Sequence, residues 1–185
     1  VSFRLKAYDE DLRIGTLRHV LVRTSEATGQ IMVVIVTGTP IFPGSKNFVG
    51  ALRKQCPEIT TVIQNINPQK TSMVLGERDK VLYGKGYIED ELMGLTFRLS
   101  PASFYQVNAK MTEKLYETAL SLAQLTPNDT VLDAYCGVGT IGMAASRSAG
   151  QVIGVELNKA AVRDAIANAK RNGIENIRFF ADDAS

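Results

Sequence analysis

The chain has 185 residues, a formal net charge of +2, and a composition that is 45% hydrophobic and 22% charged. This length allows one large or two small domains with a real core, and so small a net charge excludes any argument for nucleic-acid binding from charge alone. The two cysteines, Cys56 and Cys136, stand far apart with no C-x-x-C pair, which excludes a cysteine-built zinc or iron–sulfur site.

The chain shows no targeting or membrane signal. The N-terminal residues VSFRLKAYDEDLR lack the apolar core of a signal peptide. No apolar run reaches the roughly 18 residues that a membrane-spanning helix needs. Together with two isolated cysteines, which suit a reducing compartment, these features predict a cytoplasmic protein with no membrane partner and no bound metal.

The first hundred residues predict a strand-rich α+β unit. Two β-branched runs, at 16–23 and 30–38, are separated by TSEATG and are typical of a β-hairpin. A four-residue spacing of apolar side chains predicts a short helix at 44–56, which Pro57 ends. The other expected elements of this half are a strand at 59–67 and short strands with glycine turns within 81–100.

The second half predicts helices that alternate with strands. Residues 107–125 have helical periodicity, and Asn108 is placed to cap this helix. The elements that follow are a strand, a glycine loop and a helix at 130–149, a strand at 151–156, a helix at 158–173 with Asn158 as its cap, and a strand at 176–181. This alternation predicts an α/β domain with a parallel, doubly wound sheet over residues 103–185, preceded by the smaller α+β subdomain at 1–102.

The segment VLDAYCGVGTIG, residues 131–142, joins a strand end to the spacing G-x-G-x-x-G. In open α/β sheets, ligands bind at the carboxyl ends of the strands, where glycines let the backbone approach them. Glu156 ends the next predicted strand, where a carboxylate can accept hydrogen bonds from both hydroxyls of a ribose. The pattern therefore predicts a site for an adenosine-containing cofactor, with Gly137 and Gly139 in its loop.

The charge of Asp133 helps to decide between two such cofactors. NAD would bring its pyrophosphate to the glycine loop, next to the negative aspartate. S-adenosylmethionine has no phosphate and carries a sulfonium cation and an α-ammonium group, both of which a carboxylate attracts. The charge argument favours S-adenosylmethionine, and an NAD-dependent oxidoreductase is the alternative.

Each candidate residue also has a structural interpretation. Asp133 can cap the loop backbone, Glu156 can be a solvated strand end, and Tyr135 can be a packing residue instead of a ring that stacks on the cofactor. Asp183 follows the last predicted strand, where it would receive an adenine amino group or form part of a solvated turn. The residues by themselves leave these alternatives open.

Several segments together resemble the RNA uracil-5-methyltransferases, most closely the ribosomal RNA type. They are SPASFYQVNAKMTEKLYETAL, VLDAYCGVGTIG, VIGVELNKAAVRDAIANAKRNGI and FFADDA, with TLRHVLVR and GQIMVVIVTG nearer the N-terminus. The resemblance covers nearly the whole chain and implies a Rossmann-like methyltransferase domain, of which residues 103–185 hold the first three strands. It also implies that S-adenosylmethionine is contacted by Gln106, Tyr135, Gly137, Glu156 and Asp183.

The resemblance further implies a reaction at carbon 5 of a uridine. A cysteine thiolate adds to carbon 6 of uracil, carbon 5 takes the methyl group, and a base removes the carbon 5 proton. In the family, that cysteine and the glutamate that acts as the base lie after the third strand, past the position of Ser185. Cys136 lies in the glycine loop at the cofactor end, and the resemblance implies that it is not the nucleophile.

These implications lead to expectations about the chain as a whole. We expect a fragment that is inactive alone and whose RNA partner is ribosomal more than transfer RNA. We expect it to self-associate through the unpaired edge of strand 130–135, because an exposed apolar edge invites pairing with another chain. A non-enzymatic RNA-binding module is the second alternative to the enzyme.

Overall fold

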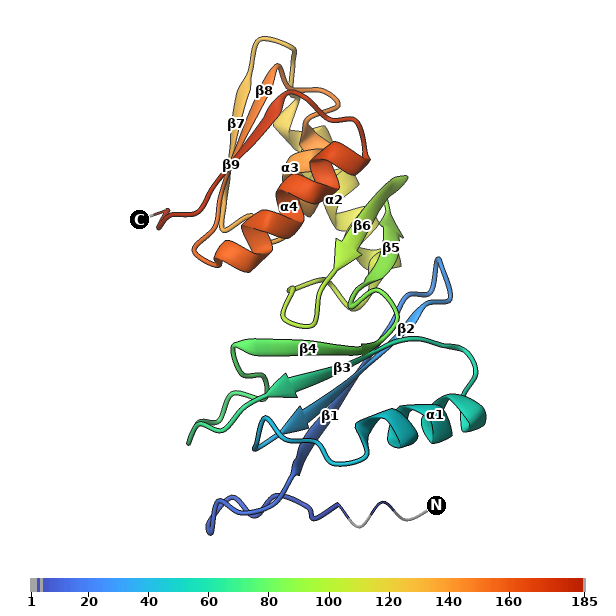
Figure 1. Ribbon diagram of the computed structural model, residues 1–185. Coiled ribbons are helices and arrows are strands. Elements are labelled where there is room, and N and C mark those ends of the chain that lie inside the picture. The colour runs from blue at the N-terminus through green and yellow to red at the C-terminus, as the bar shows by residue number, and fades with distance from the viewer. Residues whose placement is uncertain (1–2, 4, 185) are drawn as a thin grey trace. The chain divides into compact units, whose positions relative to one another are not determined.

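The computed structural model describes residue 3 and residues 5–184. The chain divides into two compact units, Val1–Ile88 and Glu89–Ser185 (Figure 1). The elements of the first unit are β1 (Leu17–Thr24), β2 (Ile31–Thr37), α1 (Ser45–Gln55), β3 (Ile59–Ile66) and β4 (Arg78–Tyr83). The elements that follow are β5 (Ile88–Leu92), β6 (Leu95–Leu99), α2 (Ala109–Ala123), β7 (Thr130–Ala134), α3 (Thr140–Ala145), β8 (Gln151–Val155), α4 (Lys159–Arg171) and β9 (Ile177–Phe180).

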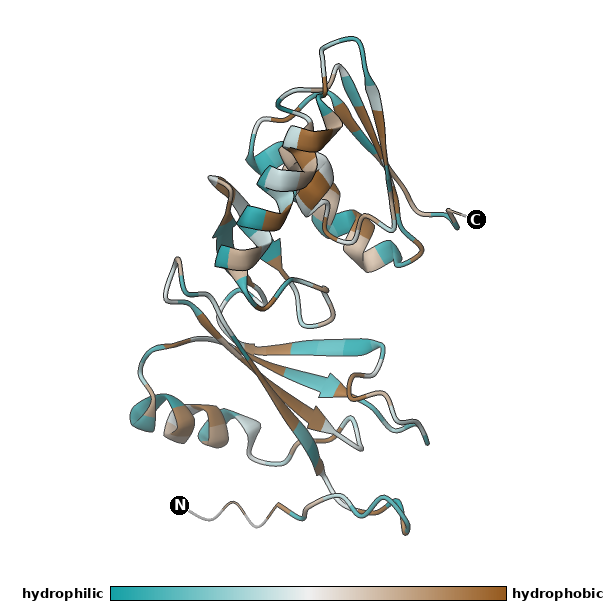
Figure 2. Ribbon diagram, turned by 180° about the vertical axis from the view of Figure 1, so that it is seen from behind, coloured by the Kyte–Doolittle hydropathy of each residue, from teal (hydrophilic) through white to brown (hydrophobic). Residues whose placement is uncertain are grey.

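The first unit is a four-stranded mixed sheet in the order β1-β2-β3-β4. β1 and β2 form the predicted antiparallel hairpin, which is confirmed. β2 and β3 run parallel, with α1 as the crossover between them, and β4 returns antiparallel to β3. Figure 2 shows β2 in the brown of apolar residues along its length, whereas β4 begins with hydrophilic residues.

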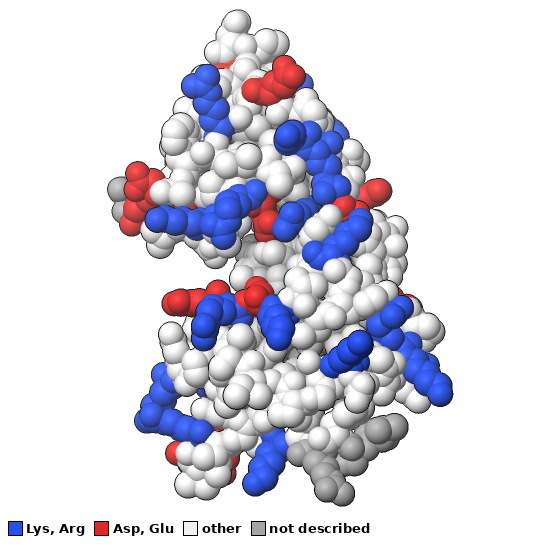
Figure 3. All heavy atoms as spheres, viewed as in Figure 1, with Lys and Arg blue, Asp and Glu red and all other residues white. Residues whose placement is uncertain are grey.

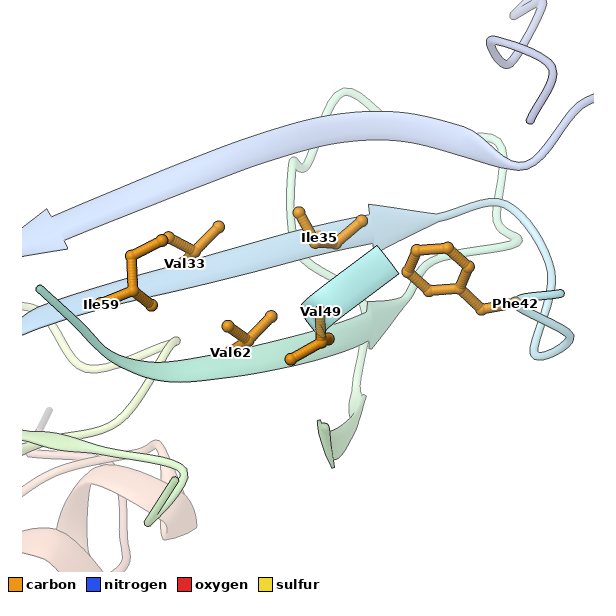
Figure 4. Close-up of a cluster of buried hydrophobic side chains, with 6 residues drawn as sticks. All are labelled: Val33, Ile35, Phe42, Val49, Ile59 and Val62. Carbon is orange, nitrogen blue, oxygen red and sulfur yellow. The ribbon is translucent and has the colours of Figure 1, made fainter. Parts of the chain in front are cut away.

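One apolar cluster of this unit lies between the sheet and α1. Alternate residues of β2 point to the same face of the sheet, so Val33 and Ile35 both lie in one cluster with Val49 of α1. The complete set of buried residues in the cluster, labelled in Figure 4, is Val33, Ile35, Phe42, Val49, Ile59 and Val62. Burial of each such side chain contributes roughly 1.5–3 kcal/mol, which holds α1 on the sheet.

The second unit contains a three-stranded sheet in the order β7-β8-β9, in which both neighbouring pairs run parallel, as the alternation of elements predicted. The helices α3 and α4 lie on the same side of this sheet (Figure 1). Both predicted helix caps are confirmed. Asn108 Oδ1 accepts a hydrogen bond from Met111 N at 3.1 Å, and Asn158 Oδ1 accepts one from Ala160 N at 2.9 Å.

The division between the units falls earlier in the chain than the sequence-based boundary at residues 102 and 103. The physical reason is that the β5–β6 hairpin bonds to α4. The backbone nitrogen of Thr96 donates to Asn172 Oδ1 at 2.9 Å, and that of Arg98 donates to Asn168 Oδ1 at 2.7 Å. The sequence pattern of residues 81–100 predicted strands, but it could not show that they bond to α4.

Strand β7 lies at one edge of the three-stranded sheet. Its burial alternates along the strand, and Leu132 is 64% exposed although it is apolar. Of the helices in the described part of the chain, none combines the length and the apolar character that a membrane span demands.

Candidate functional site

The carboxyl ends of β7, β8 and β9 meet at one edge of the second sheet because the three strands are parallel. Acidic residues occur at or after all three ends: Asp133 in β7, Glu156 directly after β8, and Asp182 and Asp183 after β9. The glycine loop leaves β7 at this edge and leads into α3. The fold therefore collects the predicted acidic residues of three separate segments at the position where open α/β sheets bind ligands.

Three residues of the glycine loop have backbone angles in the left-handed region. The φ angles are 62° at Tyr135, 56° at Gly137 and 84° at Gly139. A Cβ at Gly139 would lie 2.8 Å from Met143 Cε and 2.9 Å from the Phe179 ring, so these two side chains would have to shift to admit any other residue. A Cβ at Gly137 would have no heavy atom within 4 Å, so the space above this residue is open to a ligand.

Glu156 holds the glycine loop in place. Its Oε2 accepts a hydrogen bond from Gly137 N at 3.1 Å, and its Oε1 accepts one from Asn158 N at 2.8 Å. A carboxylate has about four acceptor positions, so each oxygen retains capacity for a further donor such as a hydroxyl group. The side chain is therefore no solvated strand end, and it can still accept hydrogen bonds from a ribose.

Asp133 lies in β7, just before the glycine loop. Its Oδ2 accepts a hydrogen bond of 3.0 Å from the backbone nitrogen of Gly142 in α3. The backbone-capping interpretation is thus realised in the structure. Burial raises the pKa of this carboxyl to about 6, the hydrogen bond from Gly142 opposes that rise, and the nearby charge of Glu156 adds to it. Near neutral pH the group is largely ionised, so two negative charges lie beside the glycine loop.

Tyr135 presents its ring to solvent, with 68% of the residue exposed. A non-glycine residue in the left-handed region costs roughly 1–2 kcal/mol relative to an ordinary backbone conformation. An exposed aromatic ring in this conformation contributes no core packing that would offset the cost. The packing interpretation of Tyr135 therefore has no support in the structure, and the ring is available to a ligand at this edge.

Cys136 lies inside the loop and is buried, with 6% of its surface exposed. Its sulfur lies 3.0 Å from the position that a Cβ on Gly154 would take, so it packs against β8. Burial, together with the charges of Asp133 and Glu156, raises the pKa of the thiol to about 12. Such a thiol is protonated at neutral pH and is a poor nucleophile.

Gln106 and Asp183 lie in exposed segments outside helices and strands. No hydrogen bond in the described part of the chain joins Gln106 to the glycine loop. The segment that carries Gln106 leads into α2, and α2 is tied to the start of α3 by the hydroxyl groups of Tyr116 and Thr140, 2.9 Å apart. Asp183 N donates to Asp182 Oδ1 at 2.9 Å in the turn after β9.

Asn168 is a residue of the site that sequence reasoning missed. It is fully buried in α4, where its Oδ1 accepts a hydrogen bond from Arg98 N at 2.7 Å and its Nδ2 donates to Val138 O at 3.4 Å. These bonds join α4 to β6 and to the glycine loop. The sequence signal that could have identified it is a single amide residue on the alanine-rich, apolar face of a predicted helix. A polar group that is buried there needs hydrogen-bond partners.

The second unit has a parallel sheet, a glycine loop after its first strand and acidic residues at or after the ends of all its strands. A solved structure identifies this arrangement as an α/β, methyltransferase-like fold. This fold occurs in the crystal structure of Pyrococcus abyssi tRNA (uracil-54, C5)-methyltransferase in complex with S-adenosyl-L-homocysteine. The two chains superpose with a TM-score of 0.78 and are 24% identical. The match covers 98% of this chain and 43% of the Pyrococcus abyssi chain. The model of the family described as tRNA (Uracil-5-)-methyltransferase matches residues 51–184. The chain belongs to this family.

Curated relatives show the same relationship. A protein of Halalkalibacterium halodurans described as an uncharacterized RNA methyltransferase is 42% identical over 180 residues, which is 97% of this chain and 39% of the relative. A protein of Lactiplantibacillus plantarum with the same description is 47% identical over 178 residues, or 96% of this chain and 39% of the relative. The chain thus spans about two fifths of the length of these relatives.

Proposed function

We propose that this chain forms the cofactor-binding part of an S-adenosylmethionine-dependent methyltransferase that acts on carbon 5 of a uridine in RNA. The observation that carries the proposal is the pair of carboxylates, Asp133 and Glu156, beside a glycine loop with open space over Gly137. Family membership supports the reaction type. The structure of the Pyrococcus abyssi relative contains S-adenosyl-L-homocysteine, which supports the choice of cofactor.

The residues fit such a cofactor by charge and by space. The carboxylate of Asp133 would attract its sulfonium and ammonium cations, and Glu156 would accept hydrogen bonds from its ribose. Tyr135, Gly137 and Gly139 would line the pocket. Gln106 would contact the methionine end and Asp183 the adenine amino group, both as the family motifs imply. When bound, S-adenosylmethionine supplies an electrophilic methyl group.

We propose that the nucleophile of this reaction is a cysteine other than Cys136, as the sequence resemblance implies. Cys136 does not suit this role because the pKa of its buried thiol is raised to about 12. We accordingly propose that these 185 residues alone have no methylating activity. We propose a uridine of ribosomal RNA as the target, from the sequence resemblance, whereas the family description names tRNA. Methylation assays of a longer relative with each RNA would decide between them.

The test of the cofactor site is a calorimetric titration of the chain with S-adenosylhomocysteine, with NAD as the control ligand. We expect S-adenosylhomocysteine to bind and NAD not to bind. Replacement of Glu156 by Ala should weaken the binding of S-adenosylhomocysteine. Binding of NAD in its place would overturn the proposal, because the acidic residues would then tolerate a pyrophosphate.

A further inference from the structure

The outward face of α4 carries cations for which the proposed cofactor site has no use. Lys159, Arg163, Ile166 and Lys170 follow one another at spacings of four, three and four residues, which places them on a single face of the helix. All four are exposed. At 1.5 Å per residue the stripe is about 16 Å long. Figure 3 shows Lys and Arg side chains gathered over α4 on this side of the second unit.

The three cations of this α4 stripe have no ion pair and no side-chain hydrogen bond among the described residues. Other basic side chains of the unit are engaged: Arg171 pairs with Glu89 at 2.6 Å, and Arg147 donates to Met93 O at 2.8 Å. The cations of the stripe are therefore available to an external anion.

Local electrostatics disfavours the N-terminal part of the stripe. Lys159 is the first residue of α4, where the helix dipole disfavours a cation, and the first turn contains no acidic residue to compensate. Lys159 and Arg163 are also like charges four residues apart, which repel each other on a helix. Lys170 lies in the last turn, where the dipole favours a cation. Helix electrostatics therefore gives no reason for Lys159 and Arg163.

A hollow of about 640 Å³ opens beside the stripe, between α4 and β9. Ile166 and Lys170 form its α4 side, and Ile174 and Ile177 contribute apolar surface to it. Ile166 is 52% exposed although it is a large apolar residue. Glu175 is the acidic residue of this lining. The surface thus combines a row of cations with an adjacent apolar recess.

We propose that the α4 stripe binds a single strand of RNA, with phosphates on Lys159, Arg163 and Lys170 and a base in the hollow against Ile166. Cations that track a backbone next to aromatic side chains on which bases stack are the combination that binds single-stranded nucleic acid. Phe179 and Phe180 also line the hollow. An acidic polypeptide would use the cations alone. The stripe begins three residues after Glu156, so a strand bound along α4 leads to the carboxyl edge of the sheet. This inference rests on the proposed function.

The test is fluorescence anisotropy of the full chain with a labelled, single-stranded RNA of mixed sequence at several salt concentrations. The variant combines Lys159→Glu, Arg163→Glu and Lys170→Glu. We expect its affinity to fall by at least about tenfold and the slope of log K against log salt to shrink by about 2, since each phosphate contact on a single strand contributes about 0.7. Ile166→Ala should weaken binding without a change in the slope.

A matched control combines Lys46→Glu, Lys54→Glu and Lys114→Glu, which are exposed cations elsewhere with the same change in total charge. It should weaken RNA binding far less than the stripe variant. Equal losses in the two triple variants would overturn the proposal, because net charge alone would explain the binding. Displacement of the RNA by polyglutamate as readily as by unlabelled RNA would also overturn it in favour of an acidic protein partner.

Titration of the same variants with S-adenosylhomocysteine separates this inference from the proposed function. The stripe variant should bind S-adenosylhomocysteine as the unaltered chain does, which also shows that it is folded. If the unaltered chain binds no S-adenosylhomocysteine, the proposed cofactor site fails while the RNA measurement still decides the role of the stripe. A milder variant with Gln at the three positions guards against loss of folding from charge reversal.

Discussion

Glu156 accepts a hydrogen bond from the backbone nitrogen of Gly137 at 3.1 Å, so the residue after β8 holds the loop that follows β7. Its second oxygen accepts from Asn158 N at 2.8 Å, next to the start of α4. One carboxylate thus fixes the glycine loop and the helix cap together. It does so at the place where we propose that the ribose of the cofactor binds, which gives substitutions of Glu156 two separable effects.

Replacement of Glu156 by Ala removes both hydrogen bonds to the backbone. We expect the free energy of unfolding to fall by about 1–2 kcal/mol and the affinity for S-adenosylhomocysteine to fall by about tenfold or more. Glu156→Gln keeps one acceptor oxygen, so its stability and its affinity should lie between those of the unaltered chain and those of Glu156→Ala. Thermal unfolding and calorimetric titration measure the two effects. Lower stability with unchanged affinity would show that Glu156 is only structural.

Asp133 should make stability depend on pH in a distinctive direction. Its pKa in the folded chain is about 6, above the ordinary value of 3.8, so the folded state binds a proton more tightly than the unfolded state. This group therefore lowers the free energy of unfolding as pH rises from about 4 to 6.

Asp133→Asn should remove that pH dependence and raise stability at pH 7.5 by roughly 1–2 kcal/mol, because the amide oxygen can still accept from Gly142 N. The same change should weaken S-adenosylmethionine binding, since the attraction for its cations is lost. Urea unfolding at pH 4.5 and 7.5 measures the first effect, with Glu175→Gln, an exposed carboxylate, as the control. An Asp133→Asn chain that keeps the unaltered pH dependence would contradict the assignment.

Gly137 and Gly139 form a matched pair for separating packing from backbone strain. Both have positive φ, so Ala at either position should cost about 1 kcal/mol of stability from the backbone alone. Ala at Gly139 also meets Met143 and Phe179 at less than 3.0 Å, which should add roughly 1–3 kcal/mol. Ala at Gly137 meets nothing and should instead reduce cofactor affinity. Equal destabilisation by the two substitutions, in urea unfolding, would argue against this division.

Cys136 should be unreactive in the folded chain. At pH 8 a thiol with a pKa of about 12 is about one part in ten thousand thiolate, and Cys136 is also buried. We expect iodoacetamide to label Cys56, which is only partly buried, much faster than Cys136. Mass spectrometry of the labelled peptides measures the two rates, and guanidinium should make them similar. Rapid labelling of Cys136 in the native chain would reopen its role as a nucleophile.

Much of the local structure follows from the sequence. Apolar spacing and turn residues predicted the hairpin of β1 and β2, the parallel strands of the second sheet and the caps at Asn108 and Asn158. These features depend on residues that are close in the chain, so a short window contains the necessary information. The glycine spacing and the acid that ends β8 likewise identified the edge at which the candidate site lies.

The partners of these elements were decided only by the tertiary structure. The parallel pairing of β2 with β3 and the attachment of the β5–β6 hairpin to α4 depend on contacts between distant segments. Asn168 satisfies the backbone of Arg98, 70 residues away, and the pKa of Asp133 follows from burial that no local pattern records. Sequence periodicity shows which side of an element is apolar. It does not show which surface covers that side, so the partners of buried polar groups become known only in the folded chain.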